Sequence, residues 1–347
     1  MEEQNHAEIA EFNDEDDDTT YDDQTSIHGL CDRLVEYSKN KGIIIELSSC
    51  RNLISALCSS HMVVLNSKVK ELVNPFLEIL NSYFGNRGHI SVGDSSWNSV
   101  FFLLWKKDEN VNYVKTDFVN DIHNSSKYKN MLNLTFITNV DHTNFEKYFG
   151  AIIDFASKPS YVHKLQLNQK QEIKIQPNTR FVVVPNGEDF LDNVSNKVLD
   201  SIAYVDIFLR KADSVKEEVE APSIVSYAHL EENIASAKNT YFIKEESWKK
   251  IDQLVESIKE LDDFSLGNKN VISMENYSSV IMECGADESD ALEAILLSKV
   301  VPLIKGLKSY KLDGGEKTYI KLIEKVFGKE NSSKVTKALK KVVPVVE

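Results

Sequence analysis

Three residues have the types and the order of a metal-dependent nuclease site. Asp154 precedes Glu172 and Lys174, and the last two form an E-x-K pattern. In such a site the carboxylates hold a divalent cation that activates the nucleophile. An E-x-K pattern also arises by chance in most lysine-rich chains. We therefore expect Glu172 and Lys174 to belong to a strand that approaches Pro177, without a nuclease role.

A second pair, Asp141 and His142, has the types needed for acid–base chemistry. A general base must reach the proton that it removes, and its partner must face it. Adjacent residues in a chain rarely face one another. We therefore expect a surface loop at this pair.

The cysteines offer a third kind of chemistry, metal binding or nucleophilic attack. They show neither C-x-x-C spacing nor a histidine at a metal-ligand interval. Without such spacing, free thiols are the usual state of cysteines in a chain of this size. We predict free thiols and no metal site at Cys31, Cys50, Cys58 and Cys284.

Lysines recur at helical spacing near the end of the chain. From Lys299 onward there are twelve lysines and five acidic residues, and none of the five arginines lies beyond residue 210. One face of a helix could carry a basic stripe suited to phosphate contacts. A solvated lysine face is the commoner explanation, because few aromatic residues and no arginines interleave with the lysines. The stripe consists of Lys317, Lys321, Lys325, Lys334, Lys337 and Lys341.

Length, composition and charge limit the class of protein. The 347 residues favour two domains, and 42% hydrophobic with 27% charged residues excludes collagen-like, disordered and disulfide-scaffold proteins. Residues 1–25 hold eleven acidic residues and no lysine or arginine, which predicts an acidic disordered tail. No apolar run approaches the ~18 residues that cross a bilayer, and the N-terminus does not resemble a signal peptide. We therefore expect a cytoplasmic protein with no membrane partner.

Short apolar, β-branched runs alternate with helical patterns in the first part of the chain. Buried strands are predicted at Met62–Leu65, Leu132–Ile137 and Arg180–Val184, which is typical of a parallel sheet covered on both faces. Beyond about residue 223 the strand signal fades, and the charged stretch Lys211–Pro222 is the predicted domain boundary. Helices are predicted at Ile27–Tyr37, Cys50–Ser60, Val69–Tyr83, Val114–His123, Phe145–Phe155, Trp248–Leu261, Tyr277–Cys284, Ala286–Leu307 and Thr318–Phe327.

Several local stretches have the order and spacing of one known family. Ile175–Asn186 is similar to P-N-x-x-[FI]-I-x-T-x-N, Val194–Asp200 to F-S-x-K-V-L-D, and Asp290–Gly306 to a lid segment. Together they resemble the AAA+ ATPases of the McrB-like branch, the motor subunits of modification-dependent restriction systems. The resemblance implies an α/β fold, with a degenerate AAA+ parallel-sheet domain at 26–215 followed by a small α-helical lid-like domain at 223–347.

The resemblance places a phosphate-binding loop directly after Met62–Leu65, where the family has G-x-x-G-x-G-K-[ST]. Glycines let backbone N–H groups surround the phosphates, the lysine neutralises charge, and the hydroxyl holds Mg²⁺. None of these residue types is retained at its position, so conventional triphosphate binding should be lost. The degenerate loop positions are Ser67, Lys68, Lys70, Val73 and Asn74.

The positions that would bind metal and activate water are replaced as well. The branch has Asp-Glu after the strand that ends at Ile137, and alignment on Glu146 puts Thr138 at the metal position and Asn139 at the water-activating one. Neither side chain can do that chemistry. Asn186 matches the sensor asparagine that orients the water. The arginines that the family supplies from a neighbouring subunit and from the lid have no counterpart.

The resemblance therefore covers residues of the structural scaffold, whereas the residues that carry the family's chemistry are absent. It predicts a non-catalytic pseudo-ATPase subunit without cofactor, an assembly or adapter protein in an oligomer. Its implied partner is an active AAA+ or nuclease subunit of a prokaryotic restriction system acting on DNA. Two alternatives stay open. An unconventional ATPase or GTPase could use Lys68, Lys70 and Asn186, and a DNA-binding or DNA-mimicking regulatory protein could use the lysine stripe or the acidic tail.

Overall fold

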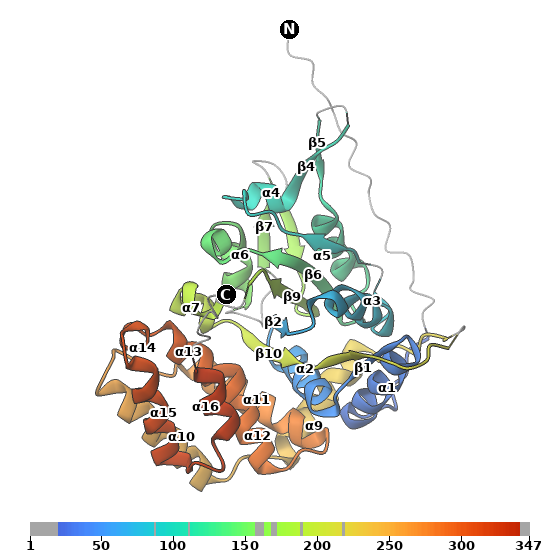
Figure 1. Cartoon of the computed structure of the whole chain (residues 1–347). Helices are drawn as coiled ribbons and strands as arrows, with labels where there is room; N and C mark the ends of the chain where they lie inside the picture. Colours follow the sequence, from blue (N-terminus) through green and yellow to red (C-terminus); the bar gives the residue numbers. More distant parts are fainter. Residues whose placement is uncertain are drawn as a thin grey trace.

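A five-stranded parallel sheet forms the centre of the fold, with the strand order β10-β2-β9-β6-β3 (Figure 1). The predicted mixed α/β architecture with a parallel sheet is thus confirmed. The strands are β2 (Met62–Ser67), β3 (Ile90–Val92), β6 (Asn133–Val140), β9 (Thr179–Pro185) and β10 (Ala203–Ile207). The computed structural model describes residues 20–86, 88–109, 112–156, 163–167, 172–187, 190–216 and 219–340.

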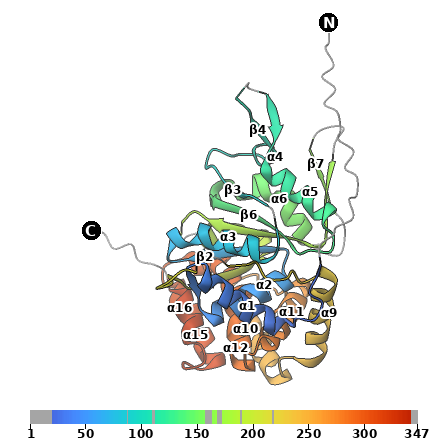
Figure 2. The ribbon, with the colours of Figure 1, turned by 90° about the vertical axis from the view of Figure 1, so that its right-hand side faces the viewer.

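The three central strands are the ones that the sequence predicts. β2, β6 and β9 are buried almost without interruption, as expected for strands covered on both faces, although β6 also buries the polar Asn133 and Thr135. Figure 1 and Figure 2 both place α5 and α6 on one side of the sheet and α1 and α2 on the other. The edge strands β3 and β10 were not predicted as strands from residue pattern, because β3 has only three residues and β10 alternates in burial.

Helices cover the sheet, and the part of the chain described after the strands is helical. Among the described residues, eight α-helices precede β10: α1 (Ile27–Asn40), α2 (Leu47–Ser59), α3 (Val73–Tyr83), α4 (Val100–Leu104), α5 (Asp117–Lys127), α6 (Phe145–Ala156), α7 (Phe190–Asn193) and α8 (Asn196–Leu199). The later helices gather at the lower part of both views (Figure 1, Figure 2). They are α9 (Tyr227–Thr240), α10 (Glu245–Lys259), α11 (Asn268–Glu283), α12 (Glu288–Ile295), α13 (Val301–Gly306), α14 (Lys308–Lys311), α15 (Gly315–Phe327) and α16 (Ser333–Leu339).

In the part of the chain that the structure describes, three pairs of short antiparallel strands lie outside the central sheet. Two are hairpins and the third joins distant parts of the chain. The pairs are β1 (Ile43–Ile45) with β11 (Leu209–Lys211), β4 (Trp105–Lys107) with β5 (Tyr113–Lys115), and β7 (His163–Gln166) with β8 (Glu172–Ile175). The strand β5 corrects one prediction. Val114 was expected to begin a helix, but its backbone pairs with Lys106, so α5 begins only at Asp117.

The predicted helix Ala286–Leu307 is interrupted. α12 and α13 are separated by a π-helical turn, Leu296–Val300, in which each backbone bond spans one residue more than in an α-helix. Pro302 stands in the first turn of α13 and contributes no backbone N–H. The missing donor explains why regular α-helical bonding does not run through this point.

A buried lysine from that turn joins the helical region to the sheet. Lys299 is 3% exposed, and its Nζ donates to the carbonyl of Ile202, just before β10, at 2.8 Å. Nearby, Asp200 accepts a hydrogen bond of 2.9 Å from Asn270 on α11. Burial lowers the pKa of Lys299 to about 7, although the charge of Asp200 opposes the shift. The helical region is thus tied to the sheet by a group that is costly to charge.

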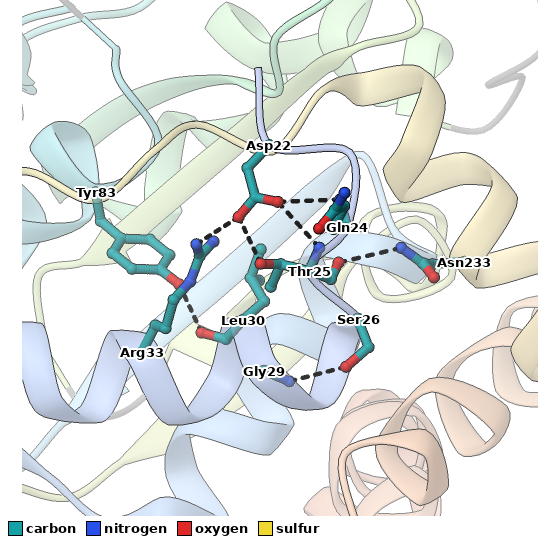
Figure 3. Close-up of polar contacts among 9 residues, drawn as sticks. All are labelled: Asp22, Gln24, Thr25, Ser26, Gly29, Leu30, Arg33, Tyr83 and Asn233. Atoms are coloured by element: carbon teal, nitrogen blue, oxygen red, sulfur yellow. Dashed lines mark hydrogen bonds and ion pairs between the residues drawn. The ribbon is translucent and has the colours of Figure 1, made fainter. Parts of the chain in front are cut away.

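The first described residues form a polar latch against α1 (Figure 3). Arg33 donates to the carboxylate of Asp22 at 2.8 Å, and the backbone N–H of Thr25 donates to it at 3.1 Å. The pKa of Asp22 falls to about 2, chiefly because the Thr25 hydroxyl also donates to it. Asn233 on α9 donates to the Thr25 carbonyl at 3.4 Å. The latch therefore contacts helices from both parts of the chain.

This latch differs from the predicted acidic tail. Composition predicts disorder through residue 25, yet residues 20–25 make specific contacts, because Asp22 finds an arginine and a hydroxyl that stabilise its charge. Residues 1–19 of the predicted tail lie outside the described residues.

The cysteines are buried, free thiols, as predicted. The sulfur of Cys31 on α1 lies 3.2 Å from that of Cys284, at the end of α11. Burial raises the pKa of the Cys58 thiol. The raised pKa reduces the thiolate fraction of Cys58, so this side chain serves packing better than nucleophilic chemistry.

Candidate functional site

The segments that the resemblance identifies do meet at one edge of the sheet. β9 lies between β2 and β6, and all three run in the same direction. Their carboxyl ends, which carry Ser67, Asn139 and Asn186, therefore point to the same side, where ligands bind in open α/β sheets. The backbone N–H of Asn186 donates to the carbonyl of Val140 at 2.8 Å and fixes the ends of β9 and β6 together.

The loop after β2 uses its own backbone N–H groups. Val69 donates its N–H to the Ser67 hydroxyl at 3.2 Å, and Leu72 donates to the Val69 carbonyl at 3.1 Å. A 3₁₀ turn, Lys70–Leu72, then leads into α3, and the N–H of Val73 donates to the Lys70 carbonyl. A phosphate needs such N–H groups free and pointing outward. This loop instead bonds the N–H groups of Val69, Leu72 and Val73 internally.

The side chains of the loop are also poorly suited to binding an anion. Val73, which stands where the family has its lysine, is 3% exposed and packs in the core. Lys70 donates its Nζ to Asn66 at 3.1 Å, and Asn66 donates in turn to Asp206 on β10 at 2.6 Å. Lys68 and Asn74 are exposed. Lys70 is thus part of a polar chain between β2 and β10.

A proline removes one more donor from this helix start. Pro75 is the third residue of α3 and carries no backbone N–H. The first turn of a helix attracts anions through its free N–H groups. Pro75 therefore weakens the anion-binding capacity of α3, a signal that the sequence contained and the motif comparison did not use.

The metal and water-activating positions have structural roles. Asn139 has a φ of 56°, the left-handed region that asparagine tolerates better than most residues. Its Nδ2 donates to the Gly93 carbonyl at 2.9 Å, and the Gly93 N–H donates to the Thr138 carbonyl at 2.8 Å. The pairing of β6 with β9 shifts register between Ile137 and Val140. Thr138 and Asn139 thus hold the end of β3 against a bulge in β6.

Asn186, the sensor-like residue, is exposed at the end of β9. The motif Ile175–Asn186 also includes residues with structural roles at the amino end of β9. There the Asn178 amide is 2% exposed and lies within 3.0 Å of the carbonyls of Tyr128 and Met131. These carbonyls follow α5, and the Asn133 amide also donates to both of them. Asn178 therefore ties the end of α5 to the amino end of β9.

Arg180 extends this structural role to the helical region. Its side chain is 2% exposed, and it donates to the carbonyls of Leu57 at 2.6 Å and Pro177 at 2.7 Å. It also lies over the ring of Tyr227 and 3.9 Å from the carboxylate of Glu231, both on α9. The motif that looks most like a nucleotide-binding strand thus holds α2, β9 and α9 together.

The other candidate sites are not assembled. Asp141 accepts the N–H of Thr143 at 2.7 Å and begins a 3₁₀ turn, as expected for a loop. The hydroxyl of Thr143 is the main cause of the lowered pKa of Asp141. Of the nuclease-like residues, Asp154 pairs with Lys197 at 2.8 Å, whereas Glu172 on β8 pairs with Lys164 on β7. The two carboxylates therefore serve separate ion pairs.

The lysine stripe is partly assembled. Three of its members are exposed on α15, and Lys337 is exposed on α16. Lys334, also on α16, pairs with Glu293 at 2.7 Å. Lys341 lies outside the described residues. The members on α15 are Lys317, Lys321 and Lys325.

Two hollows in the described part of the chain lie away from the Ser67 loop. A cavity of about 60 Å³ at the amino end of β6 contains Asp121, Asn86 and Asn133 in its lining. Burial raises the pKa of Asp121 to about 6, and the backbone N–H of His89 donates to it at 3.0 Å. A shallower hollow of about 500 Å³ is lined by His142, Thr143, Glu146, Lys147 and Asn193.

Comparisons and general properties add the following. No protein-family model matches the chain, and no curated protein matches it at a significant level. Among the residues described, no three or more histidine, cysteine, aspartate or glutamate side chains are placed to share a metal ion. Within the same residues, no helix is both long and apolar enough to cross a membrane.

Proposed function

We propose that this protein is a non-catalytic, AAA+-like pseudo-ATPase subunit that acts as an assembly or adapter partner. The observation that carries the proposal is the loop after β2. Its N–H groups at Val69, Leu72 and Val73 are bonded within the loop, and a buried valine stands at the lysine position. A triphosphate bound there would lose both the N–H donors and the neutralising charge that phosphate binding requires.

The arrangement of the sheet and its contacts with the later helices support an assembly role. β2, β9 and β6 still present their carboxyl ends together, and buried groups hold the sheet to the later helices. AAA+ domains associate through the faces that flank the nucleotide site, so a subunit without that site can still complete a ring or dock on an active relative. Contacts through Arg180 and Lys299 fix the helical region without nucleotide, and the interfaces would be held permanently.

The proposed partner and biological system follow from the resemblance alone. It indicates a cytoplasmic partner subunit, either an active AAA+ motor or a nuclease, in a prokaryotic restriction system acting on DNA. One observation disfavours the alternative of an unconventional ATPase. The amine of Lys70 donates to Asn66 on β2, and Asn66 donates to Asp206 on β10.

Molar mass measured by light scattering tests this proposal. The protein is measured over a range of concentrations, alone and with ATP or GTP plus Mg²⁺. We expect an oligomer whose mass is the same with and without nucleotide, because no nucleotide-dependent contact is needed to fix the helical region. Assembly that requires ATP or GTP would contradict the proposal and favour the nucleotide-binding alternative. A strictly monomeric protein would contradict the assembly role unless it forms a complex with an active AAA+ or nuclease subunit.

A further inference from the structure

The helix α15 presents a row of lysines opposite the face that it buries. Its buried residues recur every four positions, and so do its lysines, which are displaced by two positions. At 3.6 residues per turn, two positions correspond to about 200°, so the lysines lie on the far side. The lysines are Lys317, Lys321 and Lys325, here called the α15 lysines, and the buried residues are Tyr319, Ile323 and Phe327.

The α15 lysines differ from three lysines of the neighbouring helices, although the exposed Lys250, Lys308 and Lys337 on those helices also have no ion pair among the described residues. Lys249, Lys259 and Lys334 each form an ion pair with a glutamate. In the part of the chain that the structure describes, no such pair involves an α15 lysine. Like charges four residues apart weaken a helix. A row of unpaired lysines therefore costs helix stability, which points to an anionic partner.

The charge around α15 is positive although the whole chain is acidic. Residues 308–340 contain nine lysines and four acidic residues, in a chain of formal net charge −14. A concentrated charge of one sign attracts an oppositely charged partner locally, even when the net charge opposes it. The α15 lysines lie at the centre of this segment.

We propose that the α15 lysines bind the phosphate backbone of double-stranded nucleic acid without reading its sequence. The lysines rise ~6 Å per step along the helix, close to twice the ~3.4 Å axial spacing of phosphates on one strand. Lysine acts as a point charge toward phosphate, and the arginines suited to reading base edges are absent beyond residue 210. The proposal does not depend on the proposed pseudo-ATPase role, because it involves a different face.

Binding of a short fluorescent DNA duplex, followed by anisotropy, tests the proposal on the full chain. Wild type is compared with the triple variant Lys317→Glu, Lys321→Glu, Lys325→Glu at salt concentrations of about 50 to 200 mM. The matched control is Lys39→Glu, Lys216→Glu, Lys238→Glu, which changes net charge equally at exposed lysines on other elements. Circular dichroism of all three proteins checks that they are folded.

We expect the α15 variant to bind about tenfold or more weakly than the control, with a salt dependence of log K that is shallower by about 2 to 3. Equal losses in both variants would show a general charge effect and overturn the proposal. So would a wild-type protein that fails to bind the duplex at the lowest salt. A polyglutamate peptide serves as competitor: displacement of DNA at equal charge concentration would assign the α15 lysines to acidic protein segments instead. None of these results alters the mass measurement that tests the pseudo-ATPase role.

Discussion

Replacing Asn178 with aspartate is expected to destabilise the protein by at least about 3 kcal/mol at neutral pH. The two side chains have nearly the same shape, but the substitution exchanges an NH₂ donor for a charged oxygen. That oxygen would face the carbonyls of Tyr128 and Met131 at about 3 Å in a buried place. The loss should shrink as the pH falls below about 6, because burial raises the pKa of the new carboxyl, which then gains a proton and can donate again.

Urea denaturation at several pH values measures this effect. Asn186→Asp is the matched control, since Asn186 is exposed at the other end of the same strand. We expect the control to change stability by less than about 0.5 kcal/mol. If Asn178→Asp proves as mild as the control, the motif at the amino end of β9 does not have the structural role assigned to it.

Replacing Lys299 with methionine is expected to stabilise the protein by about 2–4 kcal/mol at pH 7. Burial lowers the folded-state pKa of Lys299 to about 7, below the ordinary value of 10.5 that applies on unfolding. Between these values the unfolded chain binds more protons, so the wild-type stability rises with pH, by up to ~1.4 kcal/mol per unit. Methionine removes both the cost of burying charge and this pH dependence.

The measurement is the free energy of unfolding from pH 7 to pH 10 for wild type and variant. The difference between the two proteins should narrow steadily as pH rises, because folding releases a proton from Lys299 and this release costs less as the pH approaches 10.5. Lys308→Met, at an exposed lysine on α14, is the control and should follow the wild-type curve. A constant difference across this pH range would mean that Lys299 is charged in the folded protein.

The central strands could be predicted from sequence because burial on both faces leaves a local signal. Met62–Leu65 is apolar at every position, and the run at Arg180–Val184 is nearly so. The edge strand β10 alternates between buried and exposed residues, and Ala203–Ile207 was not recognised. The order of the strands is a non-local property, and no local pattern states it. β9, which follows β2 and β6 along the chain, lies between them in the sheet.

The sequence predicts which phosphate-binding residues the candidate site lacks. It does not predict the structural contacts that those positions make instead. The sequence alone shows that the glycines and the lysine expected from the resemblance are absent, with Val73 at the lysine position. The hydrogen bonds that then close the loop depend on the 3₁₀ turn at Lys70–Leu72 and on Asp206, which is distant in sequence. Asn139 shows the same limit, since its partner Gly93 belongs to another strand end. Replacement by structural contacts is therefore a long-range property.

Direct titration of ATP and GTP into the protein, with and without Mg²⁺, tests the central claim that the Ser67–Asn74 loop does not bind nucleotide. Isothermal calorimetry on wild type should show no saturable heat up to millimolar nucleotide, and Lys68→Ala with Lys70→Ala should give the same trace. Saturable, Mg²⁺-dependent binding by wild type that this double variant loses would mean that the loop opens to receive phosphate, and the pseudo-ATPase account would be wrong.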